Sequence, residues 1–388
     1  MKKKSKMFFG ALLVTGAAAA PSLRTTSEAR ASEIDAPMPN TWERTCAVLA
    51  GGGTVPNRDT IARAGGPNFS QVYALGYTTR DSGGDLAPDF LVYQYSGAGN
   101  YTECGAWSPI DDGRGWAVAI AGAPDTPNHW AVNAHEELHK YFADTNEYSP
   151  PKSGLCAYGQ IAVGPNDDIW ATSCDGPGTD YGGYQARDVY EGSGCGGNDA
   201  NCTWTQREMF DGTAFGPASA IDIAFDPTPG GVAWIIASPY PPDVRVWVPA
   251  GGVFWRVSME GLPANSSITQ ISVTGPSACV AMLGECSSLN GARPRQYPVQ
   301  GWNQSIACVM TVVDEVLGGS IYCQNPTTGV WFPFAAEGWG NDPITNSPAN
   351  AFESGMLQFT MNNLRGGYSS PSFYTDWTGA LWVLNGLE

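Results

Sequence analysis

"YGQIAVGPNDDIWATS", residues 158–173, gives the clearest indication of the fold in this sequence. Two runs of apolar, β-branched and small residues lie on either side of a turn that contains Gly164, Pro165 and Asn166. Short apolar runs bounded by turn formers are typical of β-strands. The stretch therefore predicts two short strands joined by a tight turn, of which the second carries Trp170.

The first half of this stretch recurs along the chain. Similar runs are SQVYALGY (70–77), GWAVAIAG (115–122), GQIAVGP (159–165), IDIAFDP (221–227), ITQISVTG (268–275), SIACVMTVV (305–313) and GMLQFTM (355–361). Their spacing scatters around the mid-forties, and repeats of about 40 to 50 residues are typical of the blades of β-propellers. Seven runs favour seven blades, and the irregular spacing leaves six as the alternative.

Two further segment types complete each repeat. Trp-containing runs are HWAVN (129–133), IWATS (169–173), AWIIAS (233–238) and LWVLN (381–385). Aromatic-led runs are TWERTCAVLAGG (41–52), CTWTQREM (202–209), VFWRVSMEG (253–261) and VWFPFAAEG (330–338). We therefore expect an all-β fold, with residues 32–388 forming a single β-propeller of four-stranded antiparallel blades. One small sheet cannot bury both faces, so the blades must stack against each other, and a closed ring leaves no blade with a free face. The N-terminal strand is expected to close this ring by completing the last blade.

Residues 158–173 also resemble a repeat of the tectonin family of β-propeller lectins, which carry the pattern I-A-V-G-x-(D/N)-G-x-(V/I)-W. Residues 253–275 resemble the junction between two such repeats. The turn glycine of the pattern is replaced by Asp168 here and by Pro227 or Pro276 in other copies. The resemblance implies a β-propeller that recognises glycans on cell envelopes.

The N-terminus has the features of an export signal. Lys2, Lys3, Lys4 and Lys6 precede an apolar run, and Ala29-Arg30-Ala31 offers a cleavage site, so residues 1–31 are predicted to be a signal peptide. Their removal takes away six Lys/Arg and one Asp/Glu and moves the formal charge from −17 to −22. Such an acidic chain is unsuited to nucleic acid. We expect a secreted or periplasmic monomer without a membrane span.

All ten cysteines follow the predicted signal peptide, as expected for disulfides in an oxidising compartment. Close pairs are Cys156 with Cys174, Cys195 with Cys202, Cys279 with Cys286, and Cys308 with Cys323. Cys46 and Cys104 are left to pair with each other. The spacings suit disulfides that cross-link loops and hairpins, although the sequence leaves the disulfide connectivity open.

Residues 135–139, His-Glu-Glu-Leu-His, match the H-E-x-x-H pattern of zinc peptidases. In a helix, His135 and His139 would share a face and could bind one zinc ion, with Glu136 as the general base. In a strand, the two histidines would lie about 13 Å apart. The segment follows a Trp-containing strand and fills the position of a third strand. We therefore predict a strand, a turn and a strand, with the zinc site as the alternative.

Fourteen Trp and sixteen Tyr suit a protein that binds sugars, because aromatic faces stack on pyranose rings. The tryptophans that repeat with the fold are predicted to be core residues: Trp130, Trp170, Trp234 and Trp382. Four others lie in Gly-rich segments and are predicted to be exposed ligand contacts: Trp107, Trp302, Trp339 and Trp377.

These features predict an exported binding module that recognises carbohydrate or another cell-surface ligand through loops on one face of the propeller. We expect no catalytic residue and no cofactor, with calcium at the Asp- and Asn-rich turns as an alternative to zinc. Two enzymatic alternatives stay open. One is a hydrolase of the glycosidase or lyase type with acidic residues in the channel, and the other is a zinc-dependent hydrolase that uses residues 135–139.

Overall fold

The structure is a computed structural model whose described residues form an all-β fold. It describes residues 41–49, 61–64, 71–86, 88–95, 107–174, 179–181, 184–226, 231–238, 241–264, 267–274, 306–312, 319–325, 328–333, 339–341, 348–350, 356–360, 372–376 and 380–385. These residues lie in one compact unit, 38–388. Within them, the only helical turns are two 3-10 turns, Asp111–Gly113 and Pro165–Asp167. None of the described residues forms a helix long and apolar enough to cross a membrane.

The first two sheets are antiparallel and follow each other in the chain. The first contains β2 (Ile61–Ala64), β3 (Gln71–Arg80), β4 (Asp89–Tyr95) and β5 (Trp107–Pro109), and β6 (Trp116–Ala117) pairs with β4. The second contains β7 (Ala119–Gly122), β8 (His129–Val132), β9 (Leu138–Phe142) and β10 (Glu147–Tyr148), in that order. Apart from β6, each strand within these two sheets pairs with the next one in the chain, as expected for repeated antiparallel units.

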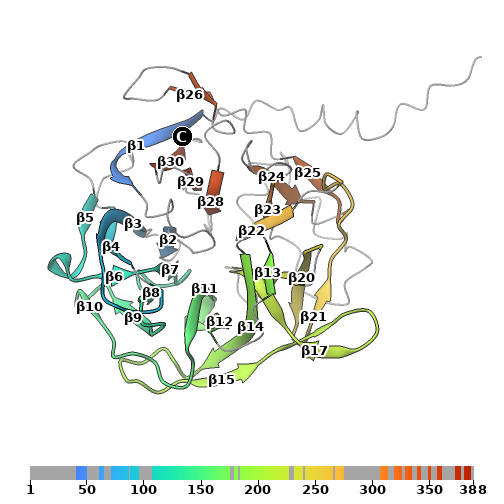
Figure 1. Cartoon of the computed structure of the whole chain (residues 1–388), viewed down its shortest axis with the longest axis horizontal. Helices are drawn as coiled ribbons and strands as arrows, with labels where there is room; N and C mark the ends of the chain where they lie inside the picture. Colours follow the sequence, from blue (N-terminus) through green and yellow to red (C-terminus); the bar gives the residue numbers. More distant parts are fainter. Residues whose placement is uncertain are drawn as a thin grey trace, which may run out of the picture. The chain divides into compact units, whose positions relative to one another are not determined.

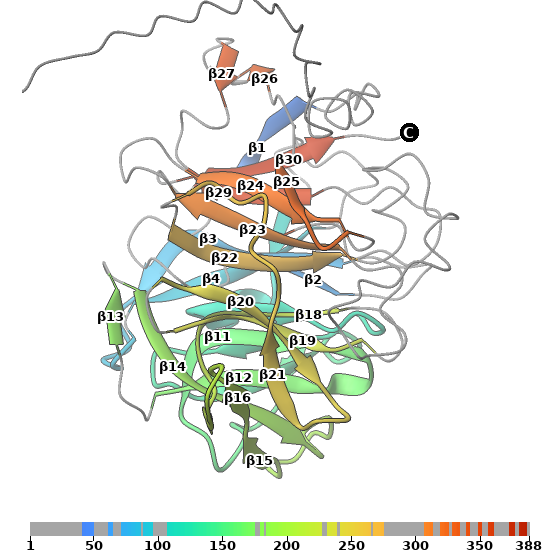
Figure 2. The ribbon, with the colours of Figure 1, turned by 90° about the vertical axis from the view of Figure 1, so that its right-hand side faces the viewer.

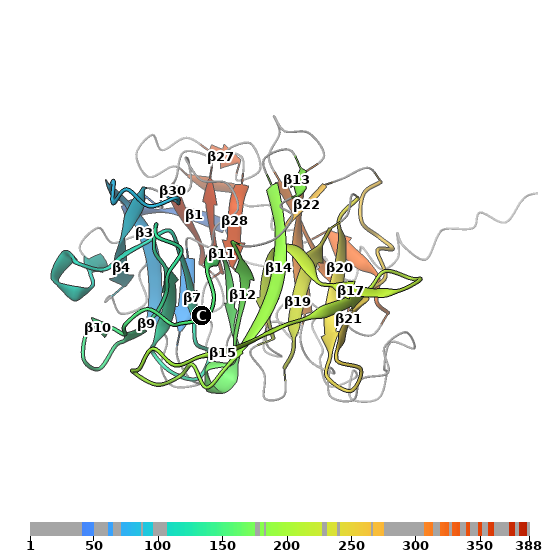
Figure 3. The same ribbon diagram turned by 60° about the horizontal axis from the view of Figure 1, so that its bottom comes forward.

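The middle of the chain forms two further sheets that are joined by pairing of β14 with β18. One contains β11 (Ala157–Val163), β12 (Ile169–Ser173), β14 (Tyr184–Ser193) and β15 (Thr203–Gln206), with β13 (Thr179–Tyr181) beside β14. The other contains β18 (Ser219–Phe225), β19 (Ala233–Ala237), β20 (Asp243–Val248) and β21 (Val253–Arg256). A hairpin of β16 (Glu208–Phe210) and β17 (Phe215–Pro217) extends the latter sheet beyond β21. Figure 3 shows β11, β12 and β14 side by side, and β19, β20 and β21 next along the chain.

The fifth sheet corrects one feature predicted from the sequence. It contains β22 (Ser267–Thr274), β23 (Ile306–Val312), β24 (Gly319–Gln324) and β25 (Trp331–Pro333), which lie side by side in Figure 2. The prediction that residues 305–313 begin a new repeat is wrong, because β23 pairs antiparallel with β22 along its length. The long interval between these two strands made the second strand of one sheet resemble the first strand of another.

The sixth sheet joins the two ends of the described chain. It contains β28 (Met356–Thr360), β29 (Ser372–Asp376), β30 (Ala380–Asn385) and β1 (Thr41–Leu49). β1 pairs antiparallel with β30, with Thr41 opposite Asn385. The prediction that an N-terminal strand completes the last sheet is confirmed. A separate hairpin contains β26 (Trp339–Asn341) and β27 (Pro348–Asn350).

The first strand of each sheet contacts the first strand of the next. Contacts join β2 to β7, β7 to β11, β11 to β18, β18 to β22, and β22 to β28, and β28 in turn contacts β2. The labels of β2, β7, β11, β22 and β28 lie around the middle of the ribbon in Figure 1. Small antiparallel sheets that meet in chain order through their first strands are the arrangement of a β-propeller.

The core fills the spaces between neighbouring sheets. Trp130, Trp170 and Trp234 are buried in it, which confirms that these tryptophans are packing residues. Trp170 packs edge-on against Trp247 and Phe254 of the following sheet. The side chain of Trp382 lies outside those that the structure describes.

Candidate functional site

The His-Glu-Glu-Leu-His segment forms a turn and the start of a strand. β8 ends at Val132, residues 133–137 form the turn, and β9 begins at Leu138. The Asn133 side-chain oxygen accepts hydrogen bonds from the backbone N–H groups of His135 and Glu137, both at 3.0 Å. Glu136 has φ of 62°, the left-handed conformation that such turns need. The predicted strand–turn–strand is confirmed, and the helical alternative is wrong for this segment.

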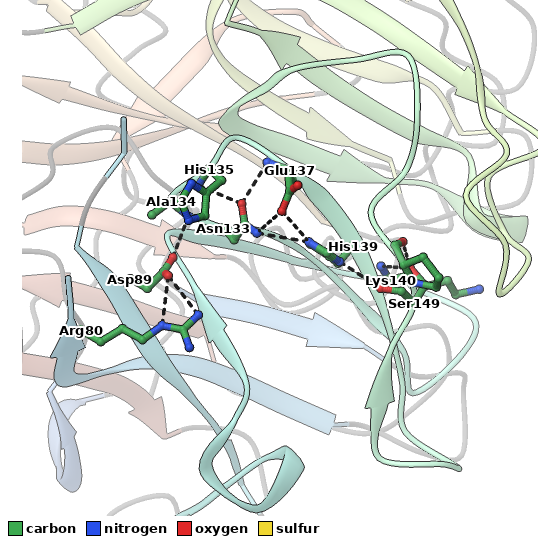
Figure 4. A network of polar contacts seen from close by, with 10 residues as sticks. Arg80, Asp89, Asn133, Ala134, His135, Glu137, His139, Lys140 and Ser149 are labelled. Atoms are coloured by element: carbon green, nitrogen blue, oxygen red, sulfur yellow. Dashed lines mark hydrogen bonds and ion pairs between the residues drawn. The ribbon is translucent and has the colours of Figure 1, made fainter. Parts of the chain in front are cut away.

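The polar groups of the turn satisfy one another (Figure 4). His139 donates from Nδ1 to the Ser149 carbonyl at 2.9 Å, which leaves Nε2 as an acceptor. The Asn133 amide nitrogen lies between this Nε2 atom, at 3.3 Å, and the Glu137 carboxylate, at 2.8 Å. The amide thus fills the place between imidazole and carboxylate that a shared cation would need. His135 is exposed at the tip of the turn.

The same turn joins three consecutive sheets. Buried Asp89 of β4 accepts the backbone N–H of Ala134 at 2.6 Å and also pairs with Arg80 (Figure 4). The N–H of Leu86 donates to the Ala134 carbonyl at 2.9 Å. On the other side, the N–H of Ala157 donates to the Glu136 carbonyl at 2.8 Å. The turn therefore has a packing role that its sequence pattern does not reveal.

One group of potential metal ligands occurs beside this turn. A Glu136 carboxylate oxygen lies close to the sulfur atoms of Cys156 and Cys174. These two cysteines form a disulfide with each other, so neither offers the thiolate that a metal ion needs.

Three of the predicted cysteine pairs are disulfides. They are Cys156–Cys174, Cys195–Cys202 and Cys308–Cys323. The first ties the start of β11 to the end of β12, and the last crosses β23 and β24. The side chains of Cys46, Cys104, Cys279 and Cys286 lie outside those that the structure describes.

Buried charged groups hold neighbouring sheets together. Lys140 of β9 donates to the Asp167 carboxylate at 2.7 Å and to the Gly196 carbonyl at 2.9 Å. Lys152 donates to the carbonyls of Gly197 and Asp199, both at 2.6 Å. The loop closed by the Cys195–Cys202 disulfide is therefore held by two ammonium groups, one from β9 and one from the segment after β10.

Asp222 links the fourth and fifth sheets. Its carboxylate accepts the backbone N–H of Ile271 in β22 at 2.7 Å and that of Ile223 at 2.9 Å. Burial raises the pKa of the Asp222 carboxyl to about 7, while these two hydrogen bonds act in the opposite direction. The register of β18 shifts next to Asp222, and the registers of β22 and β28 shift next to Gln270 and Gln358.

The predicted exposure of Trp107 is wrong. This tryptophan begins β5, is 7% exposed, and packs edge-on against Tyr95 at 5.3 Å between ring centroids. Its Gly-rich surroundings suggested a loop, whereas pairing of β5 with β4 buries the ring. Trp302 and Trp377 lie outside the described residues, as does the side chain of Trp339 in β26.

The exposed aromatic side chains of the described residues occur elsewhere. The two large hydrophobic residues that are exposed are Phe215, at 58%, and Trp255, at 38%. Phe210 lies between them, with its ring centroid 5.1 Å from that of Phe215 and 5.0 Å from that of Trp255. We call Phe215, Phe210 and Trp255 the aromatic row.

Strand pairing explains how the aromatic row forms. Phe210 is directly opposite Phe215 in the antiparallel pair of β16 and β17. β16 also pairs in parallel with β21, where Met209 is opposite Phe254. The next residues, Phe210 and Trp255, therefore lie side by side on the other face. The sequence offered no signal for this row, because nothing in it places β16 beside β21.

The middle strand of the row is fixed to β20. Arg245 is buried, and its guanidinium donates to the Phe210 carbonyl. Two further hydrogen bonds join Arg245 to the Asp243 carboxylate, at 2.7 and 3.1 Å. A bidentate pair of this kind sets the position of the guanidinium. The row is therefore held in place by a side chain from β20 of the same sheet.

Comparisons with known proteins give similarity in structure alone. No family model matches the chain, and no curated protein matches it. The chain is similar to one in the crystal structure of the mitotic checkpoint complex, with a TM-score of 0.46 and 10% identity over 98% of this chain and 100% of that one. It is also similar to TolB from Acinetobacter baumannii, with a TM-score of 0.37 and 11% identity over 81% of this chain. The chain spans 63% of the TolB chain.

Proposed function

We propose that this chain is an exported β-propeller that acts as a binding module for carbohydrate or another cell-surface ligand. The observation that carries the proposal is the aromatic row, in which exposed Phe215 and Trp255 lie on either side of Phe210 on a sheet surface. Contiguous exposed apolar side chains often mark interaction sites, whereas single exposed apolar residues are common on any protein surface. Aromatic faces are well suited to pyranose rings because these rings present C–H groups on their flat sides.

The scaffold that we propose has six blades. The contacts from β2 through β28 and back to β2 support six, the alternative to the seven that the sequence favours. The export signal at residues 1–31 and kinship with tectonin-type repeats at 158–173 and 253–275 remain predictions. Three disulfides among the described residues are consistent with a secreted or periplasmic location.

The enzymatic alternatives have less support. The strand geometry of residues 138–142 removes the helical spacing on which the zinc hypothesis depends. Several buried carboxylates have packing partners, as Asp89 has in Ala134 and Asp222 has in Ile271. A hydrolase with acidic channel residues would need two catalytic carboxylates, and the described residues do not single out such a pair.

Binding to a glycan array tests the proposal. The chain 32–388 is applied beside the Phe215→Ala and Trp255→Ala variants, with Thr205→Ala as a control at an exposed position of β15. We expect the parent chain and the control to bind the same glycans, and both aromatic variants to lose the signal. Absence of signal for the parent on every glycan, and on immobilised polysaccharides, would count against a carbohydrate ligand.

A further inference from the structure

The aromatic row is longer than one sugar ring. It crosses three strands, β17, β16 and β21, and the two steps between ring centroids measure 5.1 and 5.0 Å. These steps follow the spacing between adjacent strands, about 4.8 Å, so the row runs across the strands. Rings arranged in this way offer successive contacts to an extended ligand, and a monosaccharide would cover only part of them.

The rings of the row do not share a plane. The plane of Phe210 is tilted by 45° from that of Phe215 and by 41° from that of Trp255. A flat crystalline polymer face can stack on coplanar rings, but here it could not lie flat on Phe210 and on either of its two neighbours at once. A single chain can turn each sugar residue separately, so it can stack on tilted rings in succession.

The charges beside the row are negative. Glu208 is exposed and lies two residues before Phe210, so strand alternation places the two side chains on the same face of β16. Asp211 follows Phe210 in the turn, and hydrogen bonds from the backbone of Ala214 and Thr213 lower the pKa of its carboxyl to about 2. Both groups disfavour a polyanion on the row.

The nearby cations do not offset this. Arg245 is engaged with Asp243 and the Phe210 carbonyl. Arg256 follows Trp255 directly, so its side chain leaves the opposite face of β21, where it pairs with Asp243 at 3.1 Å. Among the residues that the structure describes, the row therefore presents aromatic surface bordered by carboxylates, without a guanidinium on its own face.

We infer that the aromatic row binds a single dissolved chain of a neutral polysaccharide, in preference to a crystalline polymer face or an acidic polymer. This inference rests on the proposed function and names the ligand class for the same surface. Phe215 and Trp255 supply the stacking contacts, and Phe210 joins them into one row. Arg245 is a positioning residue, since it acts through the strand that carries Phe210.

Affinity electrophoresis with the chain 32–388 tests the inference. Native gels contain one soluble polymer each: hydroxyethyl cellulose, xyloglucan, galactomannan or laminarin as neutral probes, polygalacturonate as the acidic probe, and soluble chitosan as the cationic probe. Sedimentation with microcrystalline cellulose and with chitin powder measures binding to flat polymer faces. Phe215→Ala removes one exposed ring, and Phe215→Tyr is the matched control that keeps an aromatic face at the same position.

We expect at least one neutral polymer to retard the parent chain and Phe215→Tyr. Phe215→Ala should weaken this binding by about tenfold, the loss that corresponds to one stacking contact. Strongest binding to polygalacturonate, chitosan or a crystalline polymer, with loss in Phe215→Ala, would overturn the inference and leave the proposed function intact. Neutral binding that Phe215→Ala and Trp255→Ala leave unchanged would overturn the site. Failure to bind any polymer would overturn the inference, and failure on the glycan array as well would overturn the carbohydrate part of the proposed function.

Discussion

The carboxylate of Asp89 accepts a hydrogen bond from the backbone N–H of Ala134 at 2.6 Å, across 45 residues of sequence. Ala134 directly precedes the His-Glu-Glu-Leu-His segment, so this contact fixes a turn that resembles a catalytic motif to the preceding sheet. The contact is buried, and Arg80 pairs with the same carboxylate at 3.2 Å. The turn is therefore part of the junction between sheets.

Asp89→Ala should destabilise the fold by about 3 kcal/mol, because it leaves the buried N–H of Ala134 without its acceptor and Arg80 without its partner. Urea unfolding, followed by tryptophan fluorescence, measures the change. Asp85→Ala is the control, since Asp85 is exposed on the segment that precedes β4. Equal stability of the two variants would show that the Asp89 contact has no part in holding the sheets.

Asp222 should make stability depend on pH. Its carboxyl has a pKa of about 7 in the folded chain, raised by burial from the ordinary 3.8, so the folded chain binds more protons than the unfolded chain between these values. The stability contributed by the protonated form is complete below about pH 4 and is lost as pH rises through about 7. Asp222→Asn removes this titration. The difference in unfolding free energy between parent and variant should therefore change from pH 4 to pH 7.5, and parallel curves would refute the assignment.

His135→Ala should leave both the stability and the metal content of the purified chain unchanged, because His135 is exposed and lies at the tip of a turn. His139→Ala should cost about 1 kcal/mol through loss of the hydrogen bond to the Ser149 carbonyl. Thermal unfolding and elemental analysis measure these effects. Stoichiometric zinc in the parent chain that disappears in His135→Ala would revive the zinc hypothesis.

Arg245→Met should loosen the aromatic row, because the Phe210 carbonyl loses its donor from β20. Compared with the parent chain, hydrogen exchange should become faster in residues 208–217 and stay unchanged in β19, which does not depend on this contact. Polysaccharide binding should weaken although Phe215 and Trp255 are unchanged. Binding as tight as that of the parent chain, with the same exchange pattern, would show that Arg245 does not position the row.

The sequence predicts where the strands of this fold form better than it predicts which strands pair with each other. Runs such as IWATS and AWIIAS carry local β-propensity, and β12 and β19 form where they are. Residues 305–313 carry the same local signal as a first strand, and only pairing with β22 shows that they form a second strand. Local composition does not encode the partner of a strand, so the sequence assigns residues 305–313 to a repeat of their own although they pair with β22.

The candidate site was less accessible to prediction for the same reason. Trp107 lies in a Gly-rich context that suggested exposure, but β4 covers it. The aromatic row depends on parallel pairing between β16 and β21. Four strands, β17 to β20, lie between them in the chain, and no pattern in the sequence indicates that the two pair. Residues 135–139 could be assigned correctly because the preceding run HWAVN is in phase with other Trp-containing strands.

The most direct test of the binding hypothesis is the affinity of the chain 32–388 for a soluble neutral polysaccharide, compared among the parent, Phe215→Tyr and Phe215→Ala. Because Phe215 is 58% exposed, its truncation should not affect folding, so a change in affinity reports on the surface itself. We predict equal binding for the parent and Phe215→Tyr, and binding about tenfold weaker for Phe215→Ala. Equal affinity of all three proteins would contradict the assignment of the aromatic row as the ligand-binding surface.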